Sequence, residues 1–275
     1  MFSRTMAAVC LSSITLSFAQ MQPVVTGAQG YGNIDWARRS VISTGIGSPN
    51  PDLPQAAQHP AALRAAQQVA LRNALETIKS IYVNSTTTVN NLMVSNAKVN
   101  SSVTGFVQGF QQQENSKNMK DGSVEVTMSI PLDGIGGMLL GTFVGSKPSI
   151  IAFEKTTVSR ELVFSGLIIN CKGHTVKPAL SPRVLDENDR EVYSSAYVSK
   201  EWVIRNGMVG YSKDVEAAIK LTDRIGSNPG QVKAKKVAGV NGTDIVITNK
   251  DANDIRSASK NLTFLSECRV IFVID

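Results

Sequence analysis

Residues 60–82 read PAALRAAQQVALRNALETIKSIY and contain the clearest helical pattern in the chain. At about 100° per residue, the apolar side chains fall on one half of a helical cylinder, and the charged and amide side chains fall on the other. Alanine recurs every four residues at Ala66, Ala70 and Ala74, so a partner can approach the helix backbone closely. Extended segments flank this helix, and we expect it to pack on a sheet. A helix–helix contact in an oligomer is the alternative.

Strand patterns lie on both sides of the helix. Residues 34–46 are rich in β-branched side chains and predict a first strand that ends in the Gly/Pro/Asn-containing turn 45–51. Residues 123–132 alternate apolar and polar side chains and give the strongest strand pattern of the chain. The Lys120-Asp121-Gly122 turn precedes that strand, and residues 99–114 are predicted to be its hairpin partner.

The second half of the chain mixes short strands with separate helices, which is typical of an α+β or α/β domain. The sequence therefore predicts an α+β fold. A long helix packs on an antiparallel sheet in an N-terminal domain of residues 34–133, and a second small α/β domain occupies residues 155–275. The segments expected in the second domain are strands at 162–170 and 268–274, a hairpin at 183–194, and helices at 213–225 and 251–266.

Residues 134–154 are expected to form a Gly-rich, apolar linker between the two domains. Linkers are normally polar, so this segment either packs against one domain or exposes an interaction surface. Met138, Leu139 and Leu140 are the candidate interaction residues, for a partner protein or for a membrane surface.

The first residues carry the pattern of a cleavable export signal. Arg4 precedes the short apolar run 6–16, and Ser17-Phe18-Ala19 places small side chains at the two positions that a signal peptidase reads. The run is too short for a membrane span, which needs about 20 apolar residues. We predict a signal peptide at residues 1–19, with an uncleaved anchor as the alternative, and a mobile leader at residues 20–33.

The formal net charge is +6 for the whole chain and +5 without the signal segment, which holds one arginine and no acidic residue. The tight basic clusters are Arg38-Arg39 and the lysines at 233, 235 and 236, and neither is interleaved with aromatic rings. Nucleic-acid-binding proteins concentrate positive charge beside stacking rings. We therefore exclude nucleic acid as a partner and assign the charge to a solvated surface or to mild attraction toward an anionic one.

Two cysteines, Cys171 and Cys268, remain after the signal segment is removed. An exported chain meets an oxidising compartment, which favours a disulfide between them. The bond requires the strand that ends at Cys171 and the strand that begins at Cys268 to be antiparallel neighbours, because parallel strands would separate the two sulfurs. We predict this disulfide, with two unrelated buried thiols as the alternative.

The sequence shows no pattern of a catalytic, cofactor or metal site. The acidic run from Asp186 to Glu191 lacks the glycine and the bidentate Glu of a calcium loop and fits a hairpin turn. No serine lies in a nucleophile elbow, and the spacing of Cys171 and His174 does not by itself make a catalytic pair. The prediction is a protein that is not an enzyme, with no catalytic residue, cofactor or metal ligand.

Several segments resemble one protein family. They are Gly45-Ile46-Gly47-Ser48, the Arg/Ala-rich stretch 62–75, and the segments 103–109 and 121–126. These segments are similar to parts of the FlgP-like family of bacterial envelope lipoproteins, which includes a small outer-membrane lipoprotein. The resemblance covers residues 34–133. It implies a long helix on an antiparallel sheet, residence in the periplasm or at the outer membrane, and, for some members, a link to flagellar structures. The chain departs from the family by lacking the lipid-bearing cysteine and by adding a C-terminal half.

Together these features predict a non-enzymatic exported protein that contributes to a bacterial cell-envelope assembly, with a flagellar outer-membrane structure as one candidate. The expected location is the periplasm or the cell surface, in association with the outer membrane. The expected partners are envelope proteins or further copies of the chain, with peripheral contact to the outer membrane. The alternative is a periplasmic ligand-binding protein or an envelope enzyme with a site between the domains. A polar cleft with converging carboxylates and His174 would favour that alternative.

Overall fold

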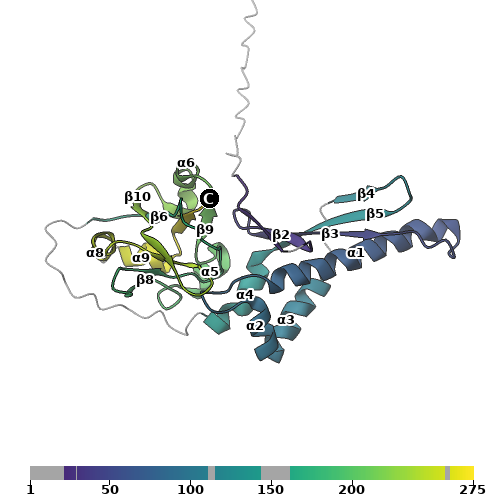
Figure 1. Cartoon of the computed structure of the whole chain (residues 1–275), viewed down its shortest axis with the longest axis horizontal. Helices are drawn as coiled ribbons and strands as arrows, with labels where there is room; N and C mark the ends of the chain where they lie inside the picture. Colours follow the sequence, from purple (N-terminus) through teal and green to yellow (C-terminus); the bar gives the residue numbers. More distant parts are fainter. Residues whose placement is uncertain (1–21, 29, 111–114, 144–161, 258–260) are drawn as a thin grey trace, which may run out of the picture.

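The computed structural model describes residues 22–28, 30–110, 115–143, 162–257 and 261–275. They form two domains that lie side by side, with the first domain extending to the right in Figure 1. The fold is α+β, as the sequence predicts: a long helix packs on an antiparallel sheet, and a small α/β domain follows. The predicted signal peptide lies outside the described residues.

The first domain is built on a five-stranded antiparallel sheet with the order β1-β2-β3-β5-β4. Helix α1 lies along β3 and β5, and the alanines of its apolar stripe are fully buried against them. The elements are β1 (Val25–Ala28), β2 (Gly32–Asp35), β3 (Ser40–Gly47), α1 (Gln55–Lys79), β4 (Asn115–Asn118) and β5 (Val124–Pro131).

The glycines of β3 explain how α1 approaches the sheet so closely. A Cβ added at Gly45 would lie 2.2 Å from the Ala66 carbonyl oxygen, and a Cβ at Gly47 would lie 2.0 Å from the Ala62 carbonyl oxygen. The glycines of β3 and the alanines of α1 therefore contact one another, and the two backbones can approach closely because neither surface carries more than a methyl group there.

The structure corrects two predictions near the N-terminus. The leader expected at 20–33 contains strand β1, whose main chain pairs with β2. The single strand expected at 34–46 is the hairpin β2–β3, because the Asp35 carboxylate accepts hydrogen bonds from the backbone of Ala37 and Arg38 and closes a turn.

The hairpin partner expected at 99–114 is instead helix α3 (Ala97–Gln108), which follows the short helix α2 (Val89–Ser95). Val99, Val103 and Val107 recur every four residues and form the buried face of α3. The Asn96 side chain caps the helix by accepting from the backbone of the first helical turn. The hairpin partner of β5 is the shorter strand β4, joined to it through the predicted turn at Gly122, whose φ is 82°.

The first part of the expected linker is also helical. Helix α4 (Leu132–Phe143) follows β5 directly, and the backbone N–H of Leu132 donates to the Arg39 carbonyl oxygen. The predicted linker residues beyond α4 lie outside the described residues. The Gly-rich sequence forms a helix here because its apolar side chains find buried positions against the helices on either side.

The second domain contains two sheets. The first is parallel with the order β10-β6-β13-β9, and the second is mixed with the order β11-β12-β7-β8. The strands are β6 (Gly166–Asn170), β7 (Val184–Leu185), β8 (Glu191–Tyr193), β9 (Gly210–Ser212), β10 (Pro229–Lys233), β11 (Lys236–Ala238), β12 (Asp244–Val246) and β13 (Val270–Val273).

Short helices connect and cover these strands. Helices α6 and α7 pack on one face of the parallel sheet through Ala218 and Ile225. The long helices expected at 213–225 and 251–266 are each divided in two, and Thr248 rather than Asp251 is the N-cap of α8. The helices are α5 (Lys200–Asn206), α6 (Val215–Ile219), α7 (Thr222–Ile225), α8 (Asn249–Arg256) and α9 (Asn261–Ser266).

The predicted hairpin at 183–194 is confirmed as β7–β8, and its acidic turn has a structural role. The Asp186 side chain is fully buried and accepts hydrogen bonds from the Asn188 and Arg190 backbone and from the Arg256 guanidinium. Burial alone would raise the pKa of Asp186, but these hydrogen bonds hold it below its usual value. The carboxylate thus ties the turn to α8.

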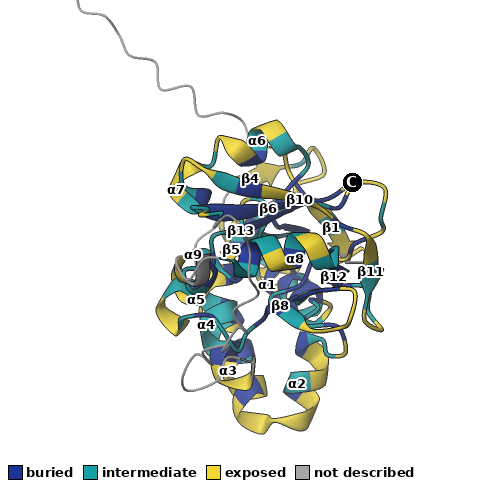
Figure 2. Cartoon of the chain, turned by 90° about the vertical axis from the view of Figure 1, so that its left-hand side faces the viewer, coloured by how far each residue is buried: buried dark blue, intermediate teal, exposed yellow. Residues whose placement is uncertain are grey.

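The two domains share one core. A single cluster of buried apolar side chains runs from the interface of α1 with its sheet into the second domain, and Figure 2 shows buried residues continuing through the strands of both. The apolar core is therefore continuous across the junction between the domains.

Candidate functional site

The predicted disulfide between Cys171 and Cys268 is wrong: both cysteines are free and buried. Strands β6 and β13 are parallel neighbours, so the cysteine after β6 and the cysteine before β13 lie at opposite ends of the sheet. Burial, followed by the Asp275 charge, raises the pKa of Cys171 to about 12, and burial raises that of Cys268 to about 11. Both are therefore inert thiols that pack as small apolar groups.

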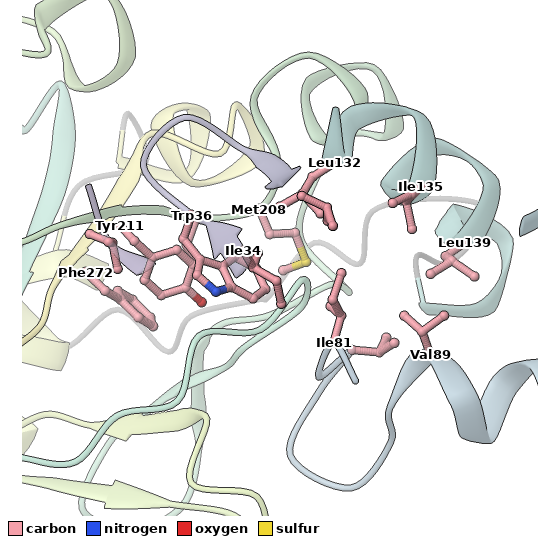
Figure 3. Packing of buried hydrophobic residues seen from close by; sticks show 14 of the residues in the cluster. Ile34, Trp36, Ile81, Val89, Leu132, Ile135, Leu139, Met208, Tyr211 and Phe272 are labelled. Carbon is pink, nitrogen blue, oxygen red and sulfur yellow. The ribbon is translucent and has the colours of Figure 1, made fainter. Parts of the chain in front are cut away.

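The predicted interaction surface at Met138, Leu139 and Leu140 is also not exposed. Leu139 and Leu140 are buried, and Met138 is a partly buried side chain packed on the same core. Figure 3 shows Ile135 and Leu139 of α4 pointing toward Val89 of α2. These residues join helices within the protein because the helical period places them on one apolar face.

The turn between β2 and β3 reaches into the second domain. Asp35 organises this turn, and Arg39 closes it in the left-handed region with a φ of 54°, a conformation that residues other than glycine adopt at an energetic cost. This geometry directs Trp36 toward β9, and the Trp36 side chain is 5% exposed. The strained turn thus places the largest side chain of the chain at the junction.

Trp36 is held by a hydrogen bond and by aromatic contacts. Its indole Nε1 donates to the Thr26 hydroxyl over 2.9 Å, and its ring meets that of Tyr211 edge-on with centroids 5.4 Å apart. Tyr211 in turn meets Phe272 at 6.0 Å, and Figure 3 shows this sequence of rings, with Met208 beside them. The Tyr211 hydroxyl donates to the Ala179 carbonyl oxygen and accepts from the Ala179 N–H. The aromatic contact is therefore both packed and hydrogen-bonded.

Main-chain hydrogen bonds also cross the junction. The N–H of Leu180 donates to the Tyr82 oxygen at 2.9 Å, and the N–H of Ser181 donates to the Val83 oxygen at 2.7 Å. A parallel bridge joins Tyr82 and Ala179. The segment that follows α1 is thereby paired with a segment of the second domain in the manner of a short sheet.

Two guanidinium groups lie beside Trp36. Arg39 forms an ion pair with Asp133 at the start of α4, while its Nη1 is buried with no hydrogen-bond partner. Arg224 donates to four main-chain oxygens, those of Asn206, Gly207, Cys268 and Val270. Burial, together with the charge of Arg39, lowers the pKa of Arg224 to about 10. The Arg224 guanidinium is therefore still charged at neutral pH.

Two cavities open on either side of Trp36. The aromatic cavity has a volume of about 500 Å³ and lies between β1, the end of α1 and residues 176–178; Tyr31, Trp36 and Tyr82 are among its lining residues. The arginine cavity has a volume of about 260 Å³ and is lined by Arg39, Arg224 and Lys220 among others. Small-ligand sites have volumes of about 300–1,000 Å³, so the aromatic cavity falls within that range.

The alternative of an interdomain site with His174 is not supported at these two cavities. His174 does not line either cavity, and its Nε2 lies 3.2 Å from the Ala234 oxygen. Within the described ranges, no group of three or more His, Cys, Asp or Glu side chains converges as metal ligands. In the same part of the chain, no helix is both long and apolar enough to span a bilayer. What the junction offers chemically is aromatic surface and positive charge.

Sequence reasoning did not find this site. Trp36 lay inside an expected strand, and Arg38-Arg39 was assigned to the solvated surface. One feature of the sequence could have indicated a turn there. Asp35 lies in the middle of a β-branched stretch, and an aspartate side chain can accept hydrogen bonds from the backbone two or three residues later and so close a turn. Its partners Tyr82, Lys177 and Tyr211 are too far away in sequence to be associated with it from pattern alone.

Comparison with known proteins bears on the second domain. A family model described as the second domain of Treponema pallidum Tp0624 matches residues 166–275, which is less than half of the chain. The match begins at the first residue of β6. Among curated proteins, no match to the chain is found. The junction therefore combines residues inside the matched region, such as Tyr211, with residues outside it, such as Trp36.

Proposed function

We propose that the protein is a non-enzymatic structural component of a bacterial cell-envelope assembly, exported after removal of residues 1–19. The observation that carries this proposal is the shared core. Trp36 of the first domain packs on Tyr211 of the second, and the backbone pairing after α1 crosses the junction. We therefore expect the two domains to keep a fixed position relative to one another. Domains with ordinary interfaces move relative to one another, whereas a component that sets the spacing of its neighbours needs a fixed shape.

The surfaces available to neighbours lie away from the junction. Strand β4 is the edge of its sheet, and all four of its residues are exposed. An exposed edge strand presents unpaired main-chain groups that another chain can extend. In Figure 1 the β4–β5 hairpin and the pair α2–α3 extend from the first domain on different sides. These features support partners that are envelope proteins or further copies of the chain.

The resemblance of residues 34–133 to FlgP-like envelope lipoproteins supports the location. Two of the four segments that carry the resemblance, 45–48 and 62–75, form the backbone contact between β3 and α1. We place the protein in the periplasm or at the outer membrane on this basis, with a flagellar outer-membrane structure as the candidate assembly. The export pattern at residues 1–19 supports the same location.

The test is made on the native protein in its own cells. A photo-crosslinking residue replaces Lys117, in exposed strand β4, and a matched control replaces Lys172, an exposed residue of the second domain. We expect cross-linked envelope species from Lys117 in gently prepared envelope fractions and an N-terminus at Gln20. The proposal fails if the protein keeps residues 1–19, or if it is recovered only as a free monomer without cross-links.

A further inference from the structure

The aromatic cavity presents a mostly apolar interior. Ile34, Trp36 and Ile81 are buried side chains that form part of its wall, and each belongs to the shared core. At its outer part lie Tyr31, whose side chain is 47% exposed, and Tyr82, which is partly buried. The exposed Tyr31 and the buried Trp36 both line this cavity with aromatic surface, which suits a planar apolar group.

A lysine that forms no ion pair among the described residues lies at the rim of this cavity. Lys177 is exposed, and its Nζ is 5.5 Å from the centroid of the Tyr82 ring. No carboxylate of the described residues forms an ion pair with it, whereas the cavity's acidic residue, Glu76, is paired with Lys79 at 2.7 Å. The positive charge of Lys177 is therefore available to a ligand, and the negative charge of Glu76 is already balanced.

We propose that the aromatic cavity binds a small organic anion that has a planar apolar body. The body would lie among Tyr31, Trp36 and Tyr82, and the anionic group would pair with the Lys177 ammonium. A volume of about 500 Å³ accommodates a molecule of about two fused or linked rings with one charged substituent. This inference does not depend on the proposed envelope role, since it follows from the cavity and its charge alone.

The test uses two probes that differ only by one sulfonate group. One is 8-anilinonaphthalene-1-sulfonate, and the other is N-phenyl-1-naphthylamine, which has the same rings without the sulfonate. The chain contains two tryptophans, Trp36 and Trp202. A Trp202→Phe background therefore leaves Trp36, a cavity residue, as the single reporter. We expect saturable, one-to-one quenching of Trp36 emission by the sulfonate.

Substitution at the rim then separates charge from shape. Lys177→Gln is expected to weaken sulfonate binding about tenfold, as loss of one charge-assisted contact does, and to leave binding of the neutral probe unchanged. Lys177→Arg is expected to retain sulfonate affinity. Lys172→Gln, at an exposed lysine that does not line the cavity, is the matched control and is expected to have no effect.

Three results would overturn the inference. The first is the absence of saturable Trp36 quenching by the sulfonate up to about 1 mM. The second is equal weakening of both probes by Lys177→Gln, and the third is no weakening of either. A urea-unfolding midpoint within error of the parent for each variant establishes that the comparison is made on folded protein. Lys177 is exposed, so its replacement removes no buried contact.

Discussion

Replacing Gly47 with alanine tests the closest contact in the first domain. The added methyl would lie 2.0 Å from the Ala62 carbonyl oxygen and 2.6 Å from the Ala66 nitrogen, whereas ordinary contact begins at 3.4 Å. Helix α1 would have to retreat by about 1.4 Å at this point. Both opposing atoms belong to the helix backbone, so no side-chain rotation can relieve the clash.

The expected cost is at the upper end of the range for overpacking, about 3 kcal/mol of unfolding free energy. With a urea dependence of about 3 kcal/mol/M for a chain of this size, the unfolding midpoint should fall by about 1 M. Circular dichroism in a urea titration measures that midpoint. Gly45→Ala should act similarly, and the double variant should cost less than the sum, because both methyls push the same helix.

Gly105→Ala is the matched control. Gly105 is an exposed residue of helix α3, and a Cβ there meets nothing within 4 Å. Alanine in a helix interior is favoured over glycine by about 0.5–1 kcal/mol, so this midpoint should rise by about 0.2–0.3 M. If Gly47→Ala unfolds at the parent's urea concentration while Gly105→Ala behaves as expected, the contact between β3 and α1 does not have the closeness described.

Three further predictions concern buried groups. The protein lacking residues 1–19, alkylated in denaturant without reduction, should take up two labels, at Cys171 and Cys268. The folded protein should label slowly because burial raises both thiol pKa values. A single unlabelled, disulfide-linked species in mass spectrometry would contradict this. The lowered pKa of Asp186 implies stability that is present above its unfolded pKa of about 3.9 and is lost as pH falls through its folded pKa. Asp186→Asn should lower the unfolding free energy at pH 7 by about 2–3 kcal/mol and reduce the loss of stability at acid pH. If stability falls at acid pH as steeply in the variant as in the parent, Asp186 does not make this contribution. Trp36→Ala should lower the unfolding free energy by about 3–5 kcal/mol, because the side chain is buried at the junction. Trp202→Ala, at a partly buried tryptophan, should cost much less. Equal losses for the two variants in thermal unfolding would refute the role of Trp36 at the junction.

The parts of the fold that could be predicted were those with a local period. Apolar and polar residues alternate strictly in strand β5, and α1 carries a long apolar stripe. Each pattern therefore indicates which face of the element is buried. Helix α3 was mistaken for a strand because Val99, Val103 and Val107 are β-branched, although their spacing of four is helical. There, burial of one helix face outweighs the intrinsic preference of valine for strands.

The candidate site was beyond sequence reasoning for a different reason. Whether Cys171 lies near Cys268 depends on whether β6 and β13 are parallel or antiparallel. The sequence pattern of a strand that is buried on both faces does not indicate this direction. The aromatic cavity likewise needs Trp36, Tyr82 and Lys177 to meet across the junction. Such contacts follow from tertiary packing, which a single sequence does not display.

The pairing of the Tyr82 and Val83 oxygens with a segment of the second domain has a consequence for the order of folding. Tyr211, which covers Trp36, comes roughly 175 positions later in the chain. Because the chain emerges N-terminus first, the hairpin turn is exposed before the residue that shields it arrives. During that interval the Trp36 indole and the main-chain oxygens of Tyr82 and Val83 lack their partners in the second domain and can bind other polypeptides. Contacts this distant in sequence also slow the final docking. The step most sensitive to chaperones is therefore the closing of the junction, and the half-made chain is more prone to aggregate than the finished one.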